Sequence, residues 1–288
     1  MKNAALINSI VGLGKCSLTI SIPVFSVAGI TPSIIPTAVL STHTGGFGTP
    51  YRADTGDCVE GFSRHWEDID IAFDAVSTGY LTSREQAEAA VRFIENQRKR
   101  AEAVGRRITV LADPTMGDHG RYYAGMAEGM ADSYKKVCAA ADIVVPNMTE
   151  ACILLGIPYT EGPYTEDYLR YVAKELCTLG CKIAVITGIG TKRGELGAAV
   201  YDSESNRFTL SLSGQCERNY HGTGDLFASV LLAAVVSGCS AVRATDIAVR
   251  FIRDCIAGTM EDDTDERLGV NFEVRLPLLM DMLRQSDK

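Results

Sequence analysis

The sequence predicts an α/β fold in which helices cover both faces of a mostly parallel sheet. Short apolar runs of strand length alternate along the chain with longer amphipathic stretches, which is the pattern of β-α-β units. Polar, glycine-containing segments follow several of these runs, as expected where loops gather at the carboxyl edge of a parallel sheet. No linker or change of composition interrupts the pattern, so we expect one domain over residues 1–288.

The first half of the chain contains most of the expected strands. Apolar runs predict strands at residues 5–11, 37–40, 75–79, 108–112, 142–145 and 183–187. Segment 17–29 favours a helix, although it contains Pro23. Thr82 and Glu85 have the spacing of a capping box that begins a further helix, and Gly105 is placed to end it.

The second half is expected to close the sheet and then turn helical. Phe208, Leu210 and Leu212 alternate after the apolar run 198–201, which predicts an antiparallel hairpin. Helices are expected from Asp225 onward, the last of them over residues 276–283.

Composition argues against several classes of protein. The 288 residues contain 28 Lys and Arg against 36 Asp and Glu, and this net charge of −8 is unlike that of a nucleic-acid binder. No run approaches the roughly 18 apolar residues of a membrane span. The nine cysteines are scattered without a Cys-x-x-Cys pair, which predicts reduced thiols and no zinc site. With no targeting segment recognised, we expect a cytoplasmic protein.

The most informative motif is His-Gly-Thr-Gly-Asp at residues 221–225, at the start of a small and apolar helix. Gly222 and Gly224 allow backbone amides to turn toward a ligand, and the helix dipole favours negative charge there, so the motif predicts an anion hole. Asp225 has two interpretations. Its carboxylate either caps the helix or acts as a general base that takes a proton from a substrate hydroxyl.

Four further polar segments follow predicted strands, namely residues 41–45 (Ser-Thr-His-Thr-Gly), 78–81 (Thr-Gly-Tyr-Leu), 113–118 (Asp-Pro-Thr-Met-Gly-Asp) and 146–150 (Pro-Asn-Met-Thr-Glu). In order and spacing, these segments and the 222–225 motif resemble the pyridoxal kinases of the ribokinase superfamily over residues 8 to 257. The resemblance implies a three-layer α-β-α sandwich with lid loops at the carboxyl edge of the sheet. It also implies a homodimer that uses ATP to phosphorylate the 5′-hydroxymethyl group of pyridoxal, pyridoxine or pyridoxamine.

The resemblance also assigns roles to particular residues. It makes Asp225 the base, with Gly222, Thr223 and Gly224 around the transferring phosphoryl group. The remaining roles are vitamer contacts for Ser9, His43, Thr44 and Tyr80, ATP contacts for Asp113, Asn147, Glu150, Thr187, Gly222 and Gly224, and Mg²⁺ binding for Asp118 and Glu150. A monovalent cation is a further candidate cofactor, which the sequence leaves open.

Several of these residues also have a purely structural interpretation. Tyr80 can be a core aromatic at a strand end, and Asn147 with Glu150 can be an N-cap and its first-turn acid. The glycines around Phe47 suit either an ordinary loop or a mobile lid, of which we favour the lid. The chain departs from many pyridoxal kinases after Ser9, where Ile10 stands in place of histidine, and this brings Lys15 and Cys16 toward the predicted ring pocket.

Three alternative functions compete with a vitamer kinase. The first is a kinase of the same superfamily for another small alcohol, such as hydroxymethylpyrimidine or a sugar. The second is a relative that binds vitamer or nucleotide without catalysis, against which Asp225 and both candidate metal acids argue. The third, a dinucleotide-binding oxidoreductase, is disfavoured because Ser17 stands where the third glycine of a Gly-x-Gly-x-x-Gly motif belongs.

Overall fold

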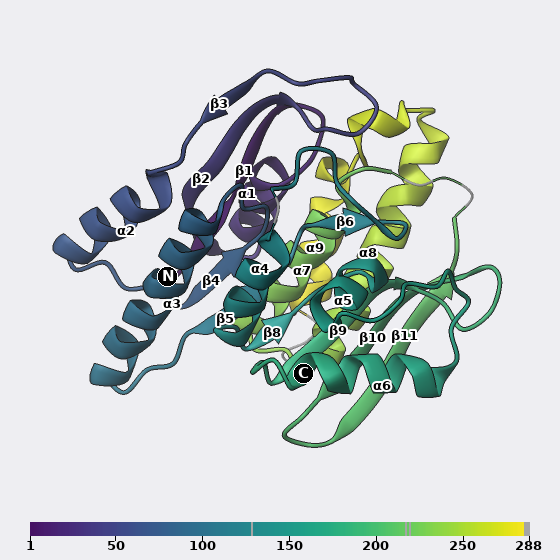
Figure 1. The fold of residues 1–288 in the computed structure, drawn as a ribbon. Helices are drawn as coiled ribbons and strands as arrows, with labels where there is room; N and C mark the ends of the chain where they lie inside the picture. Colours follow the sequence, from purple (N-terminus) through teal and green to yellow (C-terminus); the bar gives the residue numbers. More distant parts are fainter. Residues whose placement is uncertain (128, 217, 219, 285–288) are drawn as a thin grey trace.

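The computed structural model describes residues 1–127, 129–216, 218 and 220–284, and only the backbone of Asp54 (Figure 1). Within these residues, nine strands form one sheet in the order β11-β10-β9-β8-β5-β4-β1-β2-β3. The six central strands from β9 to β2 run parallel, and β3, β10 and β11 are antiparallel additions at the edges. A separate two-stranded ribbon pairs β6 with β7.

The strands span the following residues: β1 Lys2–Leu13, β2 Ile30–Thr42, β3 Arg52–Asp54, β4 Ala75–Thr78, β5 Thr109–Ala112, β6 Gly117–Asp118, β7 Arg121–Tyr122, β8 Ile143–Val144, β9 Ile183–Ile189, β10 Glu195–Asp202 and β11 Arg207–Gly214. The helices are α1 Leu18–Val27, α2 Cys58–Asp68, α3 Arg84–Ala103, α4 Met130–Ala139, α5 Met148–Leu155, α6 Glu166–Cys177, α7 Thr223–Val236, α8 Ala241–Glu261 and α9 Leu276–Arg284. Two 3₁₀ turns, Glu266–Leu268 and Glu273–Arg275, lie between α8 and α9.

Helices cover both faces of the sheet and give the molecule two apolar cores. One core contains side chains of α2 to α6, and the other contains side chains of α1, α7, α8 and α9. Strand β1 alternates between them: Ala5 and Ile7 face the first core, whereas Ala4 and Leu6 face the second. This burial on both faces explains why the strands appear in the sequence as continuous apolar runs. The predicted three-layer α/β architecture is confirmed.

Two details of the predicted elements differ from the structure. The N-cap of α3 is Ser83, whose hydroxyl accepts from the Gln86 amide at 3.3 Å, so the helix begins one residue later than the predicted capping box implied. The Gln86 side chain accepts from the Thr82 amide instead of the N-cap amide. Strand β2 is longer than predicted: it begins at Ile30, and its additional residues include Pro32 and Pro36. Prolines are tolerated there because β3 pairs only with residues 38–40 of β2, which leaves the earlier part of β2 at an edge.

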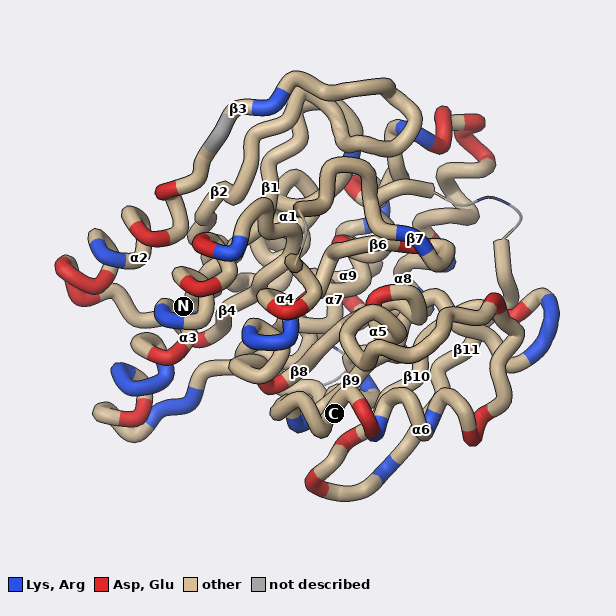
Figure 2. The backbone as a smooth tube through the Cα atoms, viewed as in Figure 1, with Lys and Arg blue, Asp and Glu red and all other residues tan. Residues whose placement is uncertain are grey.

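The other predicted elements are present. Gly105 follows α3 with a φ of 69°, the β10–β11 hairpin is antiparallel, and α9 carries Pro277 in its first turn. Figure 2 shows acidic and basic positions interspersed over the outer elements. Among the residues that the structure describes, none of the helices combines the length and the apolar character needed to cross a bilayer.

Candidate active site

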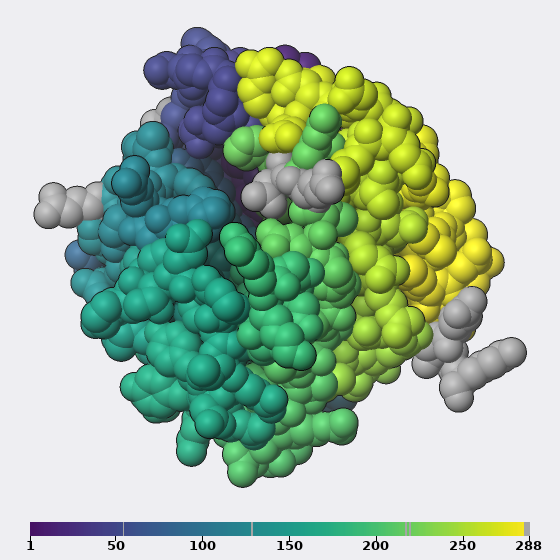
Figure 3. All heavy atoms as spheres, turned by 90° about the vertical axis from the view of Figure 1, so that its right-hand side faces the viewer, coloured from purple at the N-terminus to yellow at the C-terminus, as the bar shows by residue number. Residues whose placement is uncertain are grey.

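Most of the predicted site residues follow the carboxyl ends of neighbouring strands. β8, β5, β4 and β1 lie side by side in the sheet, and Asn147, Asp113 and Tyr80 follow the first three of them. Two other predicted site residues lie within strands, Ser9 in β1 and Thr187 in β9. The start of α7 faces the same edge through the contact between Asp225 and Asn8. Figure 3 shows a hollow in this surface between the blue-to-teal segments and the green-to-yellow segments of the chain.

Asp225 lies in the first turn of α7, but its carboxylate does not cap that helix. The N-cap is Gly222, without a side-chain capping hydrogen bond. The carboxylate instead accepts from the Asn8 side-chain amide, at 3.2 Å, and from the backbone N–H of Ser17. Burial raises the pKa of Asp225 above its ordinary value despite these hydrogen bonds. The capping interpretation is therefore wrong, and the carboxylate is held in place by residues outside its own helix.

Asn8 was not predicted to belong to the site, yet it links three of its parts. Its side-chain amide donates to Asp225, and its carbonyl oxygen accepts from the backbone amides of Ser9 at 2.8 Å and Tyr80 at 3.0 Å. A Cβ on Gly79 would lie 2.3 Å from the Asn8 amide nitrogen. Glycine at position 79 is thus required for Asn8 to occupy this position. The only sequence signal was the place of Asn8 beside Ser9 in the first strand.

Gly222 is also required by its surroundings. Its φ is 80°, a left-handed conformation that favours glycine. A Cβ at this position would lie 2.0 Å from the Lys15 carbonyl oxygen. This close approach packs the start of α7 against the segment before α1. The first-turn amides of α7 follow directly, in the arrangement expected of an anion hole.

The predicted ring pocket has an apolar wall. Val11, Cys16, Ala38 and Leu40 form a small buried cluster against which Tyr80 packs. Ser9 is buried at its edge, and its hydroxyl lies 2.9 Å from that of Ser17. Burial and the nearby charge of Asp225 raise the pKa of the Cys16 thiol, so this cysteine is protonated and is part of the wall.

The loop after β2, which the sequence predicts to be a lid, is anchored through His43. The Nδ1 atom of His43 accepts from the Gly45 amide at 3.1 Å, and its Nε2 donates to the Arg267 carbonyl oxygen at 2.6 Å. The ring also stacks on His221, at a centroid distance of 4.4 Å, and meets Phe47 edge to face. Both ring nitrogens are therefore used within the protein. Thr44, by contrast, is exposed.

Residues of the predicted nucleotide side lie on adjoining strand ends. Asp113 follows β5, and burial together with the charge of Asp225 raises its pKa to about 8. Asn147 forms a parallel bridge with Thr187, whose amide donates to the Pro146 carbonyl oxygen at 2.9 Å. The electrostatic interaction between Asp113 and Asp225 connects this side of the site with the predicted base.

Glu150 is the N3 residue of a capping box whose N-cap is Asn147, as its structural interpretation predicted. Its carboxylate is buried and accepts from the backbone amides of Asn147 at 2.9 Å and Met116 at 3.0 Å. The second of these contacts fixes the loop that carries Asp113 and Asp118. The Asp118 side chain itself is exposed on the β6–β7 ribbon. Glu150 therefore positions this loop, and direct metal binding by either acid stays a prediction.

Tyr123 follows the β6–β7 ribbon and is within electrostatic range of several acidic residues. Burial is the main cause that raises the pKa of its phenol, and the charges of Glu150, Asp118, Asp113 and Asp225 add to it. The Tyr123 hydroxyl therefore lies within electrostatic range of four acidic side chains. In the described part of the chain, no three or more His, Cys, Asp or Glu side chains converge as a ready-made metal site.

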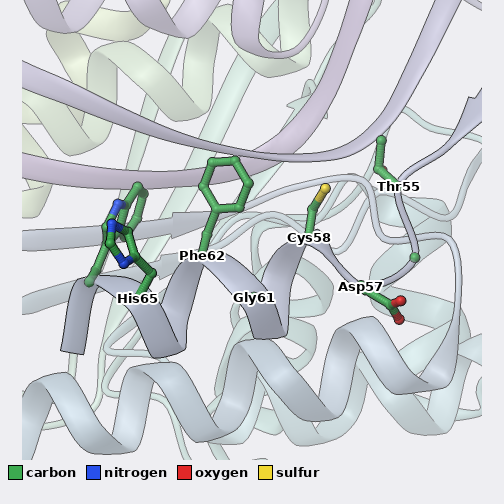
Figure 4. Close-up of a pocket in the computed structure, with 8 residues that line it drawn as sticks. Thr55, Asp57, Cys58, Gly61, Phe62 and His65 are labelled. Atoms are coloured by element: carbon green, nitrogen blue, oxygen red, sulfur yellow. The ribbon is translucent and has the colours of Figure 1, made fainter. Parts of the chain in front are cut away.

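Lys15, which was predicted to lie near the ring pocket, and His65 both lie apart from the site. The Lys15 ammonium group pairs with Glu273 at 2.9 Å and with Asn271 at 2.7 Å, and so is directed toward the C-terminal segment. His65 lies on α2 and lines a groove of about 760 Å³ (Figure 4). None of the predicted site residues lines that groove, which is therefore separate from the candidate active site.

Comparison with known proteins agrees with this geometry. Residues 22–267 match the family described as phosphomethylpyrimidine kinase. The chain belongs to this family. A pyridoxine/pyridoxal/pyridoxamine kinase of Bordetella avium is 28% identical over 277 residues, which cover 91% of this chain and 87% of that protein.

Solved structures are similar over the whole chain. A provisionally named phosphomethylpyrimidine kinase of Bacteroides thetaiotaomicron, crystallised with pyridoxal, is 30% identical, with a TM-score of 0.87 and coverage of 100% of this chain and 96% of that one. The pyridoxal kinase of Lactobacillus plantarum is 25% identical, with a TM-score of 0.88 and coverage of 99% of both chains. The predicted ribokinase-like fold and the predicted kinase class are thereby confirmed.

Proposed function

We propose that the chain transfers the γ-phosphoryl group of ATP to the 5′-hydroxymethyl group of a B6 vitamer. The observation that carries this proposal is the carboxylate of Asp225, which Asn8 and Ser17 hold between an apolar ring pocket and the start of α7. A buried acid with a raised pKa in this position is suited to accept a proton from an alcohol. The pyridoxal-bound relative and the Bordetella enzyme support the choice of vitamer.

Each part of the chain contributes a separate step. The wall formed by Val11, Ala38 and Leu40 packs on the pyridine ring, while Ser9 and Thr44 provide its polar contacts. The oxygen of the vitamer 5′-hydroxyl attacks the γ-phosphorus of ATP while Asp225 accepts the hydroxyl proton. The α7 amides hold the γ-phosphoryl group during the transfer, and ADP leaves. Asp113, Asn147 and Thr187 contact the nucleotide. Catalysis then depends mainly on positioning and on neutralisation of charge, as is usual for phosphoryl transfer.

A magnesium ion fits the donors that are present. Burial, followed by the charge of Asp225, raises the pKa of Asp113, and a divalent cation bound nearby would favour the ionised forms of both carboxyl groups. Asp118 and Glu150 would hold the ion directly or through water. When bound with ATP, the ion neutralises phosphate charge. We propose further that the enzyme is a homodimer, as its resemblance to pyridoxal kinases implies.

A vitamer panel tests the proposed function. Release of ADP would be measured with Mg·ATP and, separately, pyridoxal, pyridoxine, pyridoxamine, hydroxymethylpyrimidine and ribose. We expect turnover with B6 vitamers, with Asp225→Asn as the inactive control. Turnover confined to hydroxymethylpyrimidine would retain the base but contradict the pocket assignment. Absence of turnover with every alcohol would contradict the kinase proposal as a whole.

A further inference from the structure

Tyr134 is completely buried, and its hydroxyl contacts the backbone of two different loops. The residue lies on α4, with 0% of its surface exposed. The Leu81 amide donates to the hydroxyl at 2.8 Å, and the hydroxyl lies 3.1 Å from the Gly79 carbonyl oxygen and 3.3 Å from the Thr115 carbonyl oxygen. None of the sequence motifs included this residue.

The two loops belong to different halves of the site. Residues 79–81 follow β4, and the Tyr80 amide between them donates to Asn8, which holds Asp225. Thr115 follows β5, and its side-chain hydroxyl lies 3.2 Å from an Asp113 carboxylate oxygen. β4 and β5 are adjacent parallel strands. The Tyr134 hydroxyl is therefore placed between the backbone on the vitamer side and the backbone on the nucleotide side.

The chemistry of a phenol makes these contacts interdependent. The hydroxyl has one hydrogen, but two carbonyl oxygens lie within reach of it, while the Leu81 amide occupies an acceptor site. A stronger bond to one carbonyl is thus a weaker bond to the other. No bulk water is available to compensate at a fully buried position, so a displacement of one loop is transmitted to the other.

We propose that Tyr134 is a positioning residue that couples nucleotide binding to vitamer binding through this shared hydrogen, an inference that rests on the proposed function. When a nucleotide binds the Asp113–Thr115 loop, the Thr115 carbonyl oxygen no longer competes with the Gly79 carbonyl oxygen for the hydroxyl hydrogen of Tyr134. The hydroxyl then donates to Gly79 alone and fixes the Tyr80 amide on Asn8. Each substrate thereby raises affinity for the other by the same factor, as linkage requires. One buried neutral hydrogen bond corresponds to roughly a two- to tenfold factor.

The test measures this factor by calorimetry. The Kd of pyridoxal would be determined with and without a saturating non-hydrolysable ATP analogue and Mg²⁺, for the wild type and for Tyr134→Phe. Tyr164→Phe is the matched control, because Tyr164 is also buried but its hydroxyl donates to the Thr160 carbonyl, at 2.8 Å, away from both loops. A purely structural tyrosine would lower thermal stability without changing the ratio of the two Kd values.

We expect a two- to tenfold ratio for the wild type and for Tyr164→Phe, and a ratio near one for Tyr134→Phe, with affinity for pyridoxal alone little changed. Retention of the wild-type ratio in Tyr134→Phe would overturn the proposal. A wild-type ratio of one would also overturn it, whether or not the variant folds, and the reciprocal titration of nucleotide must give the same factor. If the wild type binds the nucleotide analogue but not pyridoxal, the proposed function fails together with the coupling.

Discussion

Replacement of Gly79 by alanine tests how Asp225 is positioned without altering any group that contacts substrate. The new Cβ would lie 2.3 Å from the Asn8 amide nitrogen and 2.6 Å from its Cγ, so the Asn8 side chain must rotate away. The backbone itself can accept alanine, because Gly79 is not among the positive-φ residues. The expected effect is therefore the loss of Asn8 from the site.

The magnitude follows from the contacts that Asn8 makes. Its bond to Asp225 has a charged acceptor, and such bonds contribute about 1.5–3 kcal/mol. At about 1.36 kcal/mol per tenfold change, turnover would fall roughly 10- to 150-fold. The amides of Ser9 and Tyr80 would also lose their acceptor, so the thermal unfolding temperature is expected to fall.

The assay is kcat by ADP release, compared among four variants. Gly61→Ala is the control, since Gly61 lies in α2 with no heavy atom within 4 Å of its added Cβ, and it should keep wild-type turnover. Asn8→Ala should resemble Gly79→Ala. The double variant should be no worse than Asn8→Ala, because both changes remove the same contact. Wild-type turnover by Gly79→Ala, or fully additive losses in the double variant, would refute the positioning role of Asn8.

Three further predictions address the base, the anion hole and the buried charge. Asp225→Asn is expected to keep pyridoxal and nucleotide binding but to lose roughly 10²–10⁴-fold in kcat, and wild-type turnover would remove this residue from the role of base. Gly222→Ala should lower kcat sharply and weaken nucleotide binding, because its Cβ would meet the Lys15 carbonyl at 2.0 Å and its φ is 80°; wild-type kinetics would contradict the assigned geometry. Asp113 has a folded pKa of about 8, above its unfolded value near 3.9, so it is protonated in the folded chain and ionised in the unfolded chain between those pH values. The free energy of unfolding should therefore fall as pH rises through this window, and urea unfolding of Asp113→Asn should show a smaller fall. An equal fall in the variant would exclude Asp113 as its source.

The parts of the site that were predictable depend on topology and local motif. Parallel strands place their carboxyl ends at one edge, so the segments after β2, β4, β5 and β8 were expected together before any contact was known. Asp225 was predicted to be a site residue because glycines at the start of a helix indicate an anion hole. In the structure, Gly222 is the N-cap, and both its φ and its contact with Lys15 require glycine.

The parts that were missed depend on contacts between distant segments. Asn8 and Asp225 are separated by 217 residues, and the Tyr134 hydroxyl reaches Gly79 across 55 residues. Neither spacing leaves a periodic or local signal. Glu150 illustrates a different difficulty, since a buried carboxylate that caps α5 and also fixes Met116 fits the local rule for a cap as well as a functional role. Sequence could propose both interpretations but could not show that one carboxylate serves two segments.

The direction of Lys15 bears on how Asp225 can act as a base. Lys15 is only two residues from Ser17, whose amide donates to Asp225, yet its ammonium group is paired with Glu273 and Asn271. An ammonium beside Asp225 would lower the pKa of the carboxylate and make it a weaker base. With Lys15 turned away, burial keeps the pKa of Asp225 raised, nearer to the range in which a carboxylate removes a proton effectively. Positive charge for the phosphates is then left to the start of α7 and to the cation that accompanies ATP, so the base and the charge stabilisation can be separately adjusted.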